Sequence, residues 1–259
     1  MKFIAGSLLR SLAMCSTLLI STAIAQADTI VLKSDLWCPY NCEPDSELPG
    51  YMIEVAQEAL GMFGHTVVYE KLNWLRSVEK ARQGEIDGVI GAVEEEVVGF
   101  VLGPPLGPLV DGIVTRVGEE LDLSKAEPLE GLTLGGINGY EYVGPLGEYI
   151  EKYRDDHNLV QFVSGDNALE MNLQKLIAGR IDVVAEDYQV ILYRLREGDL
   201  ADKFTVAHNE QPDPGYIAFS PKNPNSELYA KQLEEGLNDL RASGRLAEIM
   251  AKYSLPVWN

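Results

Sequence analysis

The chain has 259 residues, with 21 Lys and Arg against 40 Asp and Glu, which gives a formal net charge of −19 at pH 7. That length provides for two small lobes or one large domain. So acidic a balance argues against binding to nucleic acid or to anionic membrane surfaces, since both repel negative charge. A soluble exported protein and a protein with a cationic ligand both fit the charge, and charge alone favours the first.

The first residues have the order of a secretory signal peptide. Lys2 precedes a short apolar run, and small residues follow up to Ala27. The run is too short to anchor the chain in a bilayer, so we expect residues 1–27 to be removed on export to the periplasm. A buried N-terminal helix and a lipid-modified Cys15 are the alternatives, but Cys15 follows Met14, which is not the small residue that lipidation normally requires.

Two cysteines, Cys38 and Cys42, remain after that cleavage. Export places them in an oxidising compartment, and each thiol has one available partner, which predicts a disulfide across this loop. A metal site is disfavoured because two thiols without a nearby His cannot complete a tetrahedral shell. His65, His157 and His208 have no spacing suited to metal binding or catalysis. We therefore expect neither a metal nor a cofactor.

Strand-like and helix-like segments alternate along the rest of the chain. In chain order the pattern predicts a strand at 29–33, a helix at 50–63, a strand at 65–72, a helix at 74–83 and a strand at 86–92. It then predicts a strand at 132–134, a helix at 142–154, a strand at 159–163, a helix at 168–178, strands at 181–185 and 216–219, and two final helices. Such alternation indicates α/β lobes with mainly parallel sheets.

One short segment occurs twice. Residues 83–90 and 178–185 both read as a helix end, a Gly, one charged residue, Ile-Asp and a buried strand. The Gly suits the left-handed residue that ends a helix. Open α/β sheets bind ligands beyond the carboxyl ends of their strands, so the residues after these two strands are expected at facing mouths of two lobes. These residues are Gly91 and Ala92 after the first strand, and Glu186 and Asp187 after the second.

Several motifs stand in register between residues 29 and 255, among them 49–56, 84–87, 129–135 and the segment Leu-Ile-Ala-Gly-Arg-Ile-Asp at 176–182. Together they resemble the family 3 extracellular solute-binding proteins, periplasmic receptors for polar amino acids and related solutes. The resemblance implies a two-lobed periplasmic binding protein fold of type II, in which each lobe is a mainly parallel sheet flanked by helices. Two hinge strands would join lobe 1, at 28–112 plus 212–259, to lobe 2, at 113–211.

The resemblance also implies a function. Such a protein closes as a monomer on a small polar ligand, an amino acid or a related amine-bearing solute, and delivers it to an ABC permease of the inner membrane. A receptor that presents its ligand to a membrane sensor is one alternative. A periplasmic enzyme of dehydratase or lyase type on the same fold is another. The sequence contains no nucleophile elbow, metalloprotease motif or phosphate loop, so we expect a binder and not an enzyme.

The loop after the first strand faces the cleft in the family, which implies that Trp37 and Tyr40 contact the ligand. Trp74 would lie at the cleft rim. Tyr140 and Glu141 occupy the place where the family binds ligand with backbone N–H groups at a helix start. Packing in a core is the alternative for each aromatic residue.

Amino-acid receptors of this family carry an Arg shortly after the third strand, which pairs with the ligand carboxylate. Here residues 91–100 contain no Arg but hold three consecutive glutamates, at 94–96. Arg76 either replaces the missing Arg or is a surface residue. Glu186 or Asp187 is expected to receive a ligand ammonium group, unless its role is to cap the next helix. The sequence therefore predicts a ligand with a cationic group.

Overall fold

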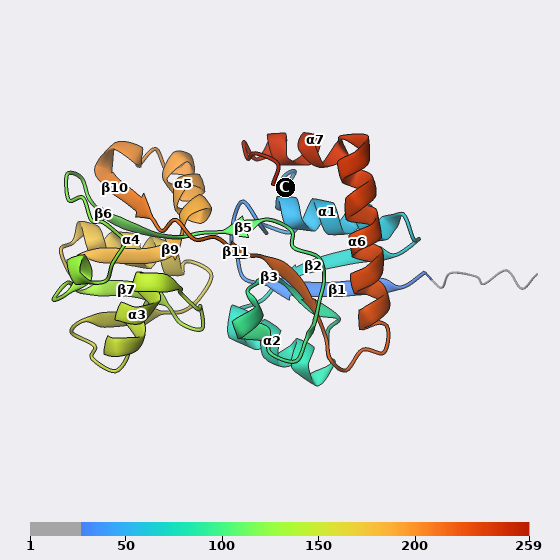
Figure 1. Cartoon of the computed structure of the whole chain (residues 1–259), viewed down its shortest axis with the longest axis horizontal. Coiled ribbons are helices and arrows are strands. Elements are labelled where there is room, and N and C mark those ends of the chain that lie inside the picture. Colours follow the sequence, from blue (N-terminus) through green and yellow to red (C-terminus); the bar gives the residue numbers. More distant parts are fainter. Residues whose placement is uncertain (1–26, 259) are drawn as a thin grey trace, which may run out of the picture.

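The computed structural model describes residues 27–258, so the predictions of a signal peptide and of a possible lipid on Cys15 fall on residues outside the described part. Two five-stranded sheets form two lobes, with a two-stranded sheet between them (Figure 1). The strand order is β2-β1-β3-β12-β4 in the first sheet and β10-β6-β9-β7-β8 in the second. The blue and red ends of the described chain belong to one lobe, and the green to orange middle forms the other.

The elements of the first lobe are β1 (Thr29–Ser34), α1 (Tyr51–Gly61), β2 (Thr66–Lys71), α2 (Trp74–Gln83), β3 (Gly88–Ala92), η1 (Glu94–Val97), β4 (Val101–Leu102), β12 (Tyr216–Phe219), α6 (Ser226–Ser243) and α7 (Arg245–Lys252). Those of the second are β6 (Asp111–Arg116), η2 (Glu127–Leu129), β7 (Leu134–Ile137), α3 (Gly144–Tyr153), β8 (Val160–Val163), α4 (Ala168–Ile177), β9 (Val183–Asp187), α5 (Tyr188–Glu197), η3 (Ala201–Lys203) and β10 (Phe204–His208).

Each sheet combines parallel and antiparallel neighbours. β1 pairs in parallel with β2 and β3, and β7 pairs in parallel with β8 and β9. β12 runs antiparallel to β3 and β4, and β6 runs antiparallel to β9 and β10. The sheets are therefore more mixed than the sequence pattern predicts. The reason is that β6 and β12 enter directly from the opposite lobe and run against the strands that helices connect.

Two chain segments join the lobes. β5 (Pro108–Leu109) and β11 (Asp213–Pro214) pair antiparallel, with Asp213 opposite Leu109, and both lie between the lobes in Figure 1. The two-strand connection implied by the family resemblance is thus confirmed. The exact lobe boundaries at residues 112 and 212 remain a prediction.

The repeated Gly-x-Ile-Asp segment has the same structural role in each lobe. Its Gly follows a helix in a left-handed conformation, with φ of 82° in the first copy and 65° in the second. Its Asp accepts a hydrogen bond from a backbone N–H at the edge of the neighbouring strand. Asp87 Oδ2 accepts from the N–H of Val31 at 2.7 Å, and Asp182 Oδ2 accepts from the N–H of Thr133 at 3.0 Å. The repeat therefore positions β3 beside β1 and β9 beside β7, and so places the ends of these strands at the cleft.

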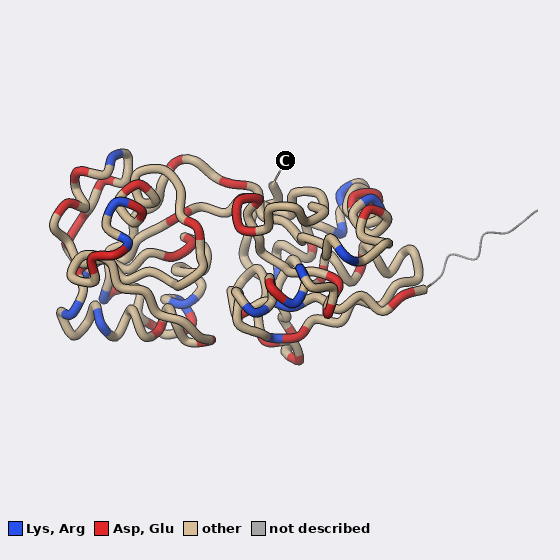
Figure 2. The backbone as a smooth tube through the Cα atoms, turned by 90° about the horizontal axis from the view of Figure 1, so that it is seen from below, with Lys and Arg blue, Asp and Glu red and all other residues tan. Residues whose placement is uncertain are grey.

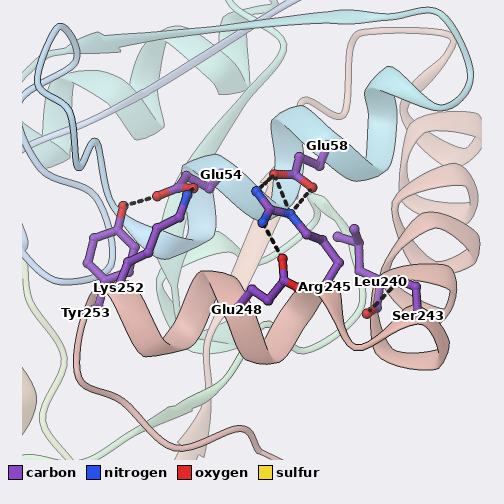
Figure 3. A network of polar contacts seen from close by, with 8 residues as sticks. All are labelled: Glu54, Glu58, Leu240, Ser243, Arg245, Glu248, Lys252 and Tyr253. Atoms are coloured by element: carbon purple, nitrogen blue, oxygen red, sulfur yellow. Dashed lines mark hydrogen bonds and ion pairs between the residues drawn. The ribbon is translucent and has the colours of Figure 1, made fainter.

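Helices α6 and α7 cover α1 and complete the first lobe. Leu233 and Leu237 of α6 share a fully buried cluster with Leu60 of α1. Beside this cluster, Arg245 donates from Nε and Nη2 to the two carboxylate oxygens of Glu58, at 2.9 and 2.7 Å (Figure 3). Apolar burial supplies most of the stabilisation, and the two-pronged ion pair fixes how α7 lies on α1.

Acidic residues are distributed along the backbone of both lobes, with basic residues among them (Figure 2). In the view of Figure 2 they do not gather on one outer face. Within residues 27–258 no helix combines the length and apolar character needed to cross a bilayer. In the view of Figure 2 the excess of acidic residues therefore marks no single outer surface.

Candidate functional site

A small cavity lies where the carboxyl ends of strands from the two lobes face each other. Its lining comes from segments that follow β1 and β3 in the first lobe and β7 and β9 in the second. The cavity volume is about 50 Å³, which is enough for roughly one or two water molecules. The fold thus brings together the strand ends at which open α/β sheets bind ligands.

The charged lining of this cavity is acidic. Seven carboxyl groups reach it, from Asp35, Glu96, Asp111, Glu141, Glu186, Asp187 and Asp213. No Lys, Arg or His lines it among the residues that the structure describes. Four aromatic side chains complete the wall, those of Trp37, Trp74, Tyr140 and Tyr142. An uncompensated group of carboxylates produces a field that favours cations, and the faces of aromatic rings add to it.

Two aromatic donors of the first lobe reach carboxylates of the second. Trp37 Nε1 donates to Glu186 Oε1 at 2.8 Å, and Tyr40 OH donates to Asp187 Oδ1 at 3.0 Å. The Trp37 and Tyr40 rings stack, with 4.5 Å between their centroids. Because these donors come from one loop and the acceptors are consecutive residues, the loop after β1 docks as a unit on the end of β9.

Two further hydrogen bonds cross the cleft in the opposite sense. Tyr140 OH of the second lobe donates to Asp35 Oδ2 of the first at 2.9 Å, and the backbone N–H of Glu141 donates to Glu96 Oε1 at 3.1 Å. Each lobe thus supplies both donors and carboxylate acceptors to the other. The lobes are in direct contact around the cavity, which explains its small volume.

The neighbouring acids Glu186 and Asp187 differ in their hydrogen bonds. Both Asp187 oxygens are occupied: Oδ1 caps α5 by accepting the N–H groups of Gln189 and Val190 at 2.8 and 3.1 Å, and Oδ2 accepts the N–H of Val110 at 2.9 Å. Glu186 accepts hydrogen bonds only at Oε1, so Oε2 has no donor within the described residues. Glu186 as a whole is 1% exposed, but Oε2 is not among the fully buried atoms that lack a partner, so this oxygen reaches the cavity, where a ligand can donate to it.

Burial raises the pKa of the carboxyl groups around the cavity. Removal from water raises the pKa of Glu186 to about 8 and that of Asp187 to about 6, and the Asp187 carboxyl adds to the rise at Glu186. Desolvation likewise raises the pKa of Asp35 to about 6, of Glu96 to about 8 and of Asp111 to about 7. Near neutral pH some of these carboxyls are therefore protonated in the ligand-free protein, and a bound cation would take the place of those protons.

The loop that carries Trp37 is closed by a disulfide between Cys38 and Cys42, whose Cα atoms are 4.8 Å apart. The predicted disulfide is thus confirmed. Gly91 lets this loop approach β3, because a Cβ at Gly91 would lie 3.1 Å from the Trp37 ring, and its φ of 83° is left-handed. The disulfide and the glycine together set the position from which Trp37 reaches Glu186.

The structure brings most of the predicted ligand-contact residues to the cavity. These are Trp37, Trp74, Gly91, Tyr140, Glu141, Glu186 and Asp187. Three others do not line it. Tyr40 and Ala92 are buried at 1% and 0% exposure, Tyr40 against Asp187 and Ala92 in an apolar cluster under β3. Arg76 lies exposed on α2, because Asn73 caps the helix and directs Trp74 inward instead.

Four acids that line the cavity were not among the predicted contacts: Asp35, Glu96, Asp111 and Asp213. Asp35 directly follows β1, and its position at a strand end is a signal that sequence reasoning can use. Glu96 belongs to the glutamates at 94–96, which the sequence analysis treats only as a group of charges. Asp111 begins β6, and no local pattern marks it.

Within residues 27–258 no group of three or more His, Cys, Asp or Glu side chains is arranged to hold a metal ion. The carboxylates approach the cavity singly, each with its own hydrogen-bond donors. The geometry therefore suits hydrogen bonding to an organic cation, with Glu186 Oε2 as the free acceptor.

No family model matches the sequence, and no curated protein matches it. Solved structures do match. An ancestral arginine-binding protein bound to arginine is 21% identical, with a TM-score of 0.70 over 87% of this chain and 97% of that chain. A protein described for glutathione import through the cystine ABC importer of Streptococcus mutans is 19% identical, with a TM-score of 0.74 over 90% and 98% of the two chains. A histidine kinase sensor domain similar to periplasmic binding proteins is 22% identical, with a TM-score of 0.70 over 87% and 95%.

These similarities extend over nearly the full length of the matched chains. They show that the protein has the two-lobed α/β fold of the periplasmic binding proteins, as the sequence predicts. A fold can host several functions, so the role of this chain is argued from the cavity.

Proposed function

We propose that the protein is a periplasmic solute-binding protein of family 3 whose lobes close on a small ligand with a cationic amine, and that Glu186 receives this amine. One observation carries the proposal: a buried carboxylate with an unoccupied oxygen lies in an interlobe cavity whose charged lining is acidic. In the fold's usual mode of action, closure of the two lobes on a ligand changes the surface that a membrane partner recognises.

The binding role is supported by the fold and by the described roles of similar structures, which include an arginine-binding protein and a protein of an ABC importer. On this proposal the protein is a monomer that delivers its ligand to an inner-membrane ABC permease without converting it chemically. The moving bodies are the two lobes, divided near residues 112 and 212.

The amine is supported by the electrostatics of the cavity. An anionic ligand group would meet seven carboxyl groups and, among the described lining residues, no cationic partner. An ammonium group would instead donate to Glu186 Oε2 beside the Trp37 and Tyr140 rings, which line the same cavity. Charge-assisted hydrogen bonds and contact with ring faces both favour this arrangement.

A receptor that presents its ligand to a membrane sensor is the second candidate, favoured by the similarity to a histidine kinase sensor domain. Both roles use the same ligand cavity and differ in the membrane partner. Neighbouring permease and ATPase genes would favour uptake, whereas a neighbouring sensor kinase gene would favour signalling.

The proposal is tested by Glu186→Gln. A thermal-shift screen of primary amines, amino acids and dicarboxylates identifies a ligand, and isothermal titration calorimetry then measures its affinity. Gln keeps the oxygen that accepts from Trp37 but replaces the free oxygen with an amide NH₂, so amine binding should weaken by roughly 1.5–3 kcal/mol, about 10- to 100-fold.

Glu94→Gln is the matched control, since Glu94 is exposed in η1 and absent from the cavity lining. This variant makes the same charge change and should bind as the wild type does. Tight binding of a dicarboxylate that is lost in Arg76→Ala and kept in Glu186→Gln would overturn the proposal.

A further inference from the structure

A second and larger cavity adjoins the small one. Its volume is about 390 Å³, against about 50 Å³ for the first, and sites for small organic ligands occupy roughly 300–1,000 Å³. It lies between the loop after β1, which supplies Leu36 and Cys38, and the starts of α4 and α5 in the second lobe. With the lobes in contact, an organic ligand held by Glu186 therefore fits only if most of it occupies the larger cavity.

The two cavities share part of their walls. Asp35, Tyr140 and Glu186 line both. Tyr140 is hydrogen-bonded to Asp35, whereas Glu186 keeps Oε2 free of donors within the described residues. A group bound to that oxygen thus lies at the boundary of the larger cavity, and the rest of the ligand extends into it.

Apart from Asp35 and Glu186 at the boundary with the small cavity, the buried lining of the larger cavity is apolar. Ile137, Ala168 and Val190 line it and are 5%, 5% and 6% exposed, and Leu36 and Leu169 add further hydrocarbon surface. A hydrocarbon group placed there leaves water without stranding a polar atom, which favours its binding.

Away from Asp35 and Glu186, the charged residues of the larger cavity are more exposed, and they are paired. Arg194 forms an ion pair with Glu170, and Asp166 lies 3.7 Å from Lys71 of the opposite lobe. The exposed fraction of the side chain is 31% for Glu170, 37% for Arg194 and 51% for Asp166. A second charge on the ligand would have to break one of these pairs to gain a partner.

We propose that the ligand is a monocationic primary amine with a neutral, apolar tail. Its ammonium group binds Glu186, and its tail fills the larger cavity between Leu36 of the first lobe and Ala168 of the second. This inference rests on the proposed function and adds the chemical class of the ligand. The tail then contacts both lobes, so the apolar surface that it buries stabilises their closure.

Three amines of matched length test the tail. They are hexylamine, 2-(2-aminoethoxy)ethanol with a polar neutral tail, and cadaverine with a second ammonium group, each titrated calorimetrically into the full-length mature protein. Hexylamine should bind at least about 10-fold more tightly than either of the others, because only its tail gains from apolar burial. If cadaverine or the polar amine binds as tightly as hexylamine, the apolar tail is refuted while amine binding stands.

Ala168→Met tests the location, because the longer side chain occupies part of the larger cavity. It should weaken hexylamine binding about 10-fold and leave the binding of methylamine, which has no tail to place in this cavity, within about 2-fold. Ile177→Met is the control, since Ile177 ends the same helix and is 60% exposed. If Ala168→Met fails to fold by circular dichroism, Leu36→Phe fills the same cavity from the other lobe with the same expectation.

The outcomes separate this inference from the proposed function. Equal binding of hexylamine to wild type, Ala168→Met and Leu36→Phe would overturn the placement of the tail. Absence of binding by all three amines, with tight binding of a carboxylate ligand, would instead overturn the proposed function itself.

Discussion

Binding of a primary amine should tighten as the pH rises from 6 to 8. Burial, together with the smaller effect of the nearby Asp187 and Asp35 carboxyls, raises the pKa of Glu186 to about 8 from the ordinary 4.5. An ammonium ion binds the ionised carboxylate, so the proton on Glu186 has to leave first. A group with this pKa is about 1% ionised at pH 6 and about half ionised at pH 8, so the affinity should rise about 50-fold.

Calorimetric titration of hexylamine at pH 6, 7 and 8 measures this change. The amine itself stays protonated, since alkylammonium groups resemble Lys, with a pKa of about 10.4. Repeating the titration at pH 7 in buffers with different ionisation enthalpies counts the protons released. Glu186→Gln should lose most of the pH dependence and Glu94→Gln should keep it. An affinity that stays constant or falls between pH 6 and 8 in the wild-type protein would refute the reasoning.

Two further predictions concern stability. A raised pKa means that the folded protein binds more protons than the unfolded chain between pH 4.5 and 8, so the free energy of unfolding falls as the pH rises through the pKa of Glu186. Scanning fluorimetry should therefore show a lower melting temperature at pH 8 than at pH 5, with a smaller difference in Glu186→Gln; equal melting temperatures in the wild type would contradict this. Arg245→Met removes the contact with Glu58 shown in Figure 3 and should lower the free energy of unfolding by about 1 kcal/mol in urea titration. Its hexylamine affinity should not change, and a loss would connect this distant contact to binding.

Local patterns predicted the helices better than the strands. The helix expected at 74–83 is α2, because Asn73 caps its start and Gly84 adopts the left-handed conformation that ends it. The strands expected at 132–134 and 181–185 begin later, at Leu134 and Val183. The reason is that strand pairing starts only after the hydrogen bond between Asp182 and Thr133, and apolar composition carries no information about where pairing starts.

The site shows the same division. Position at a strand end was enough to identify Glu186 and Asp187 as cleft acids, but the sequence left open which of them caps a helix and which receives a ligand. The hydrogen bonds decide this, since Asp187 is fully occupied and Glu186 retains a free oxygen. The sequence could not place Arg76, because a helical residue that is close in sequence to a cleft residue can still lie on the solvent-exposed face of its helix.

The sequence by itself indicated the α/β character through its periodicity and the disulfide through two cysteines in one short loop, and its resemblance to the family 3 solute-binding proteins implied the two lobes and the cleft between them. Only the tertiary structure decided the lining of the cavities, the partners of each carboxylate and the raised pKa values. Trp37 and Glu186 are 149 residues apart in the chain, and whether a carboxylate is buried or satisfied depends on side chains brought from the other lobe. A contact of this kind cannot be predicted from local sequence, because it forms only when both lobes have folded and come together.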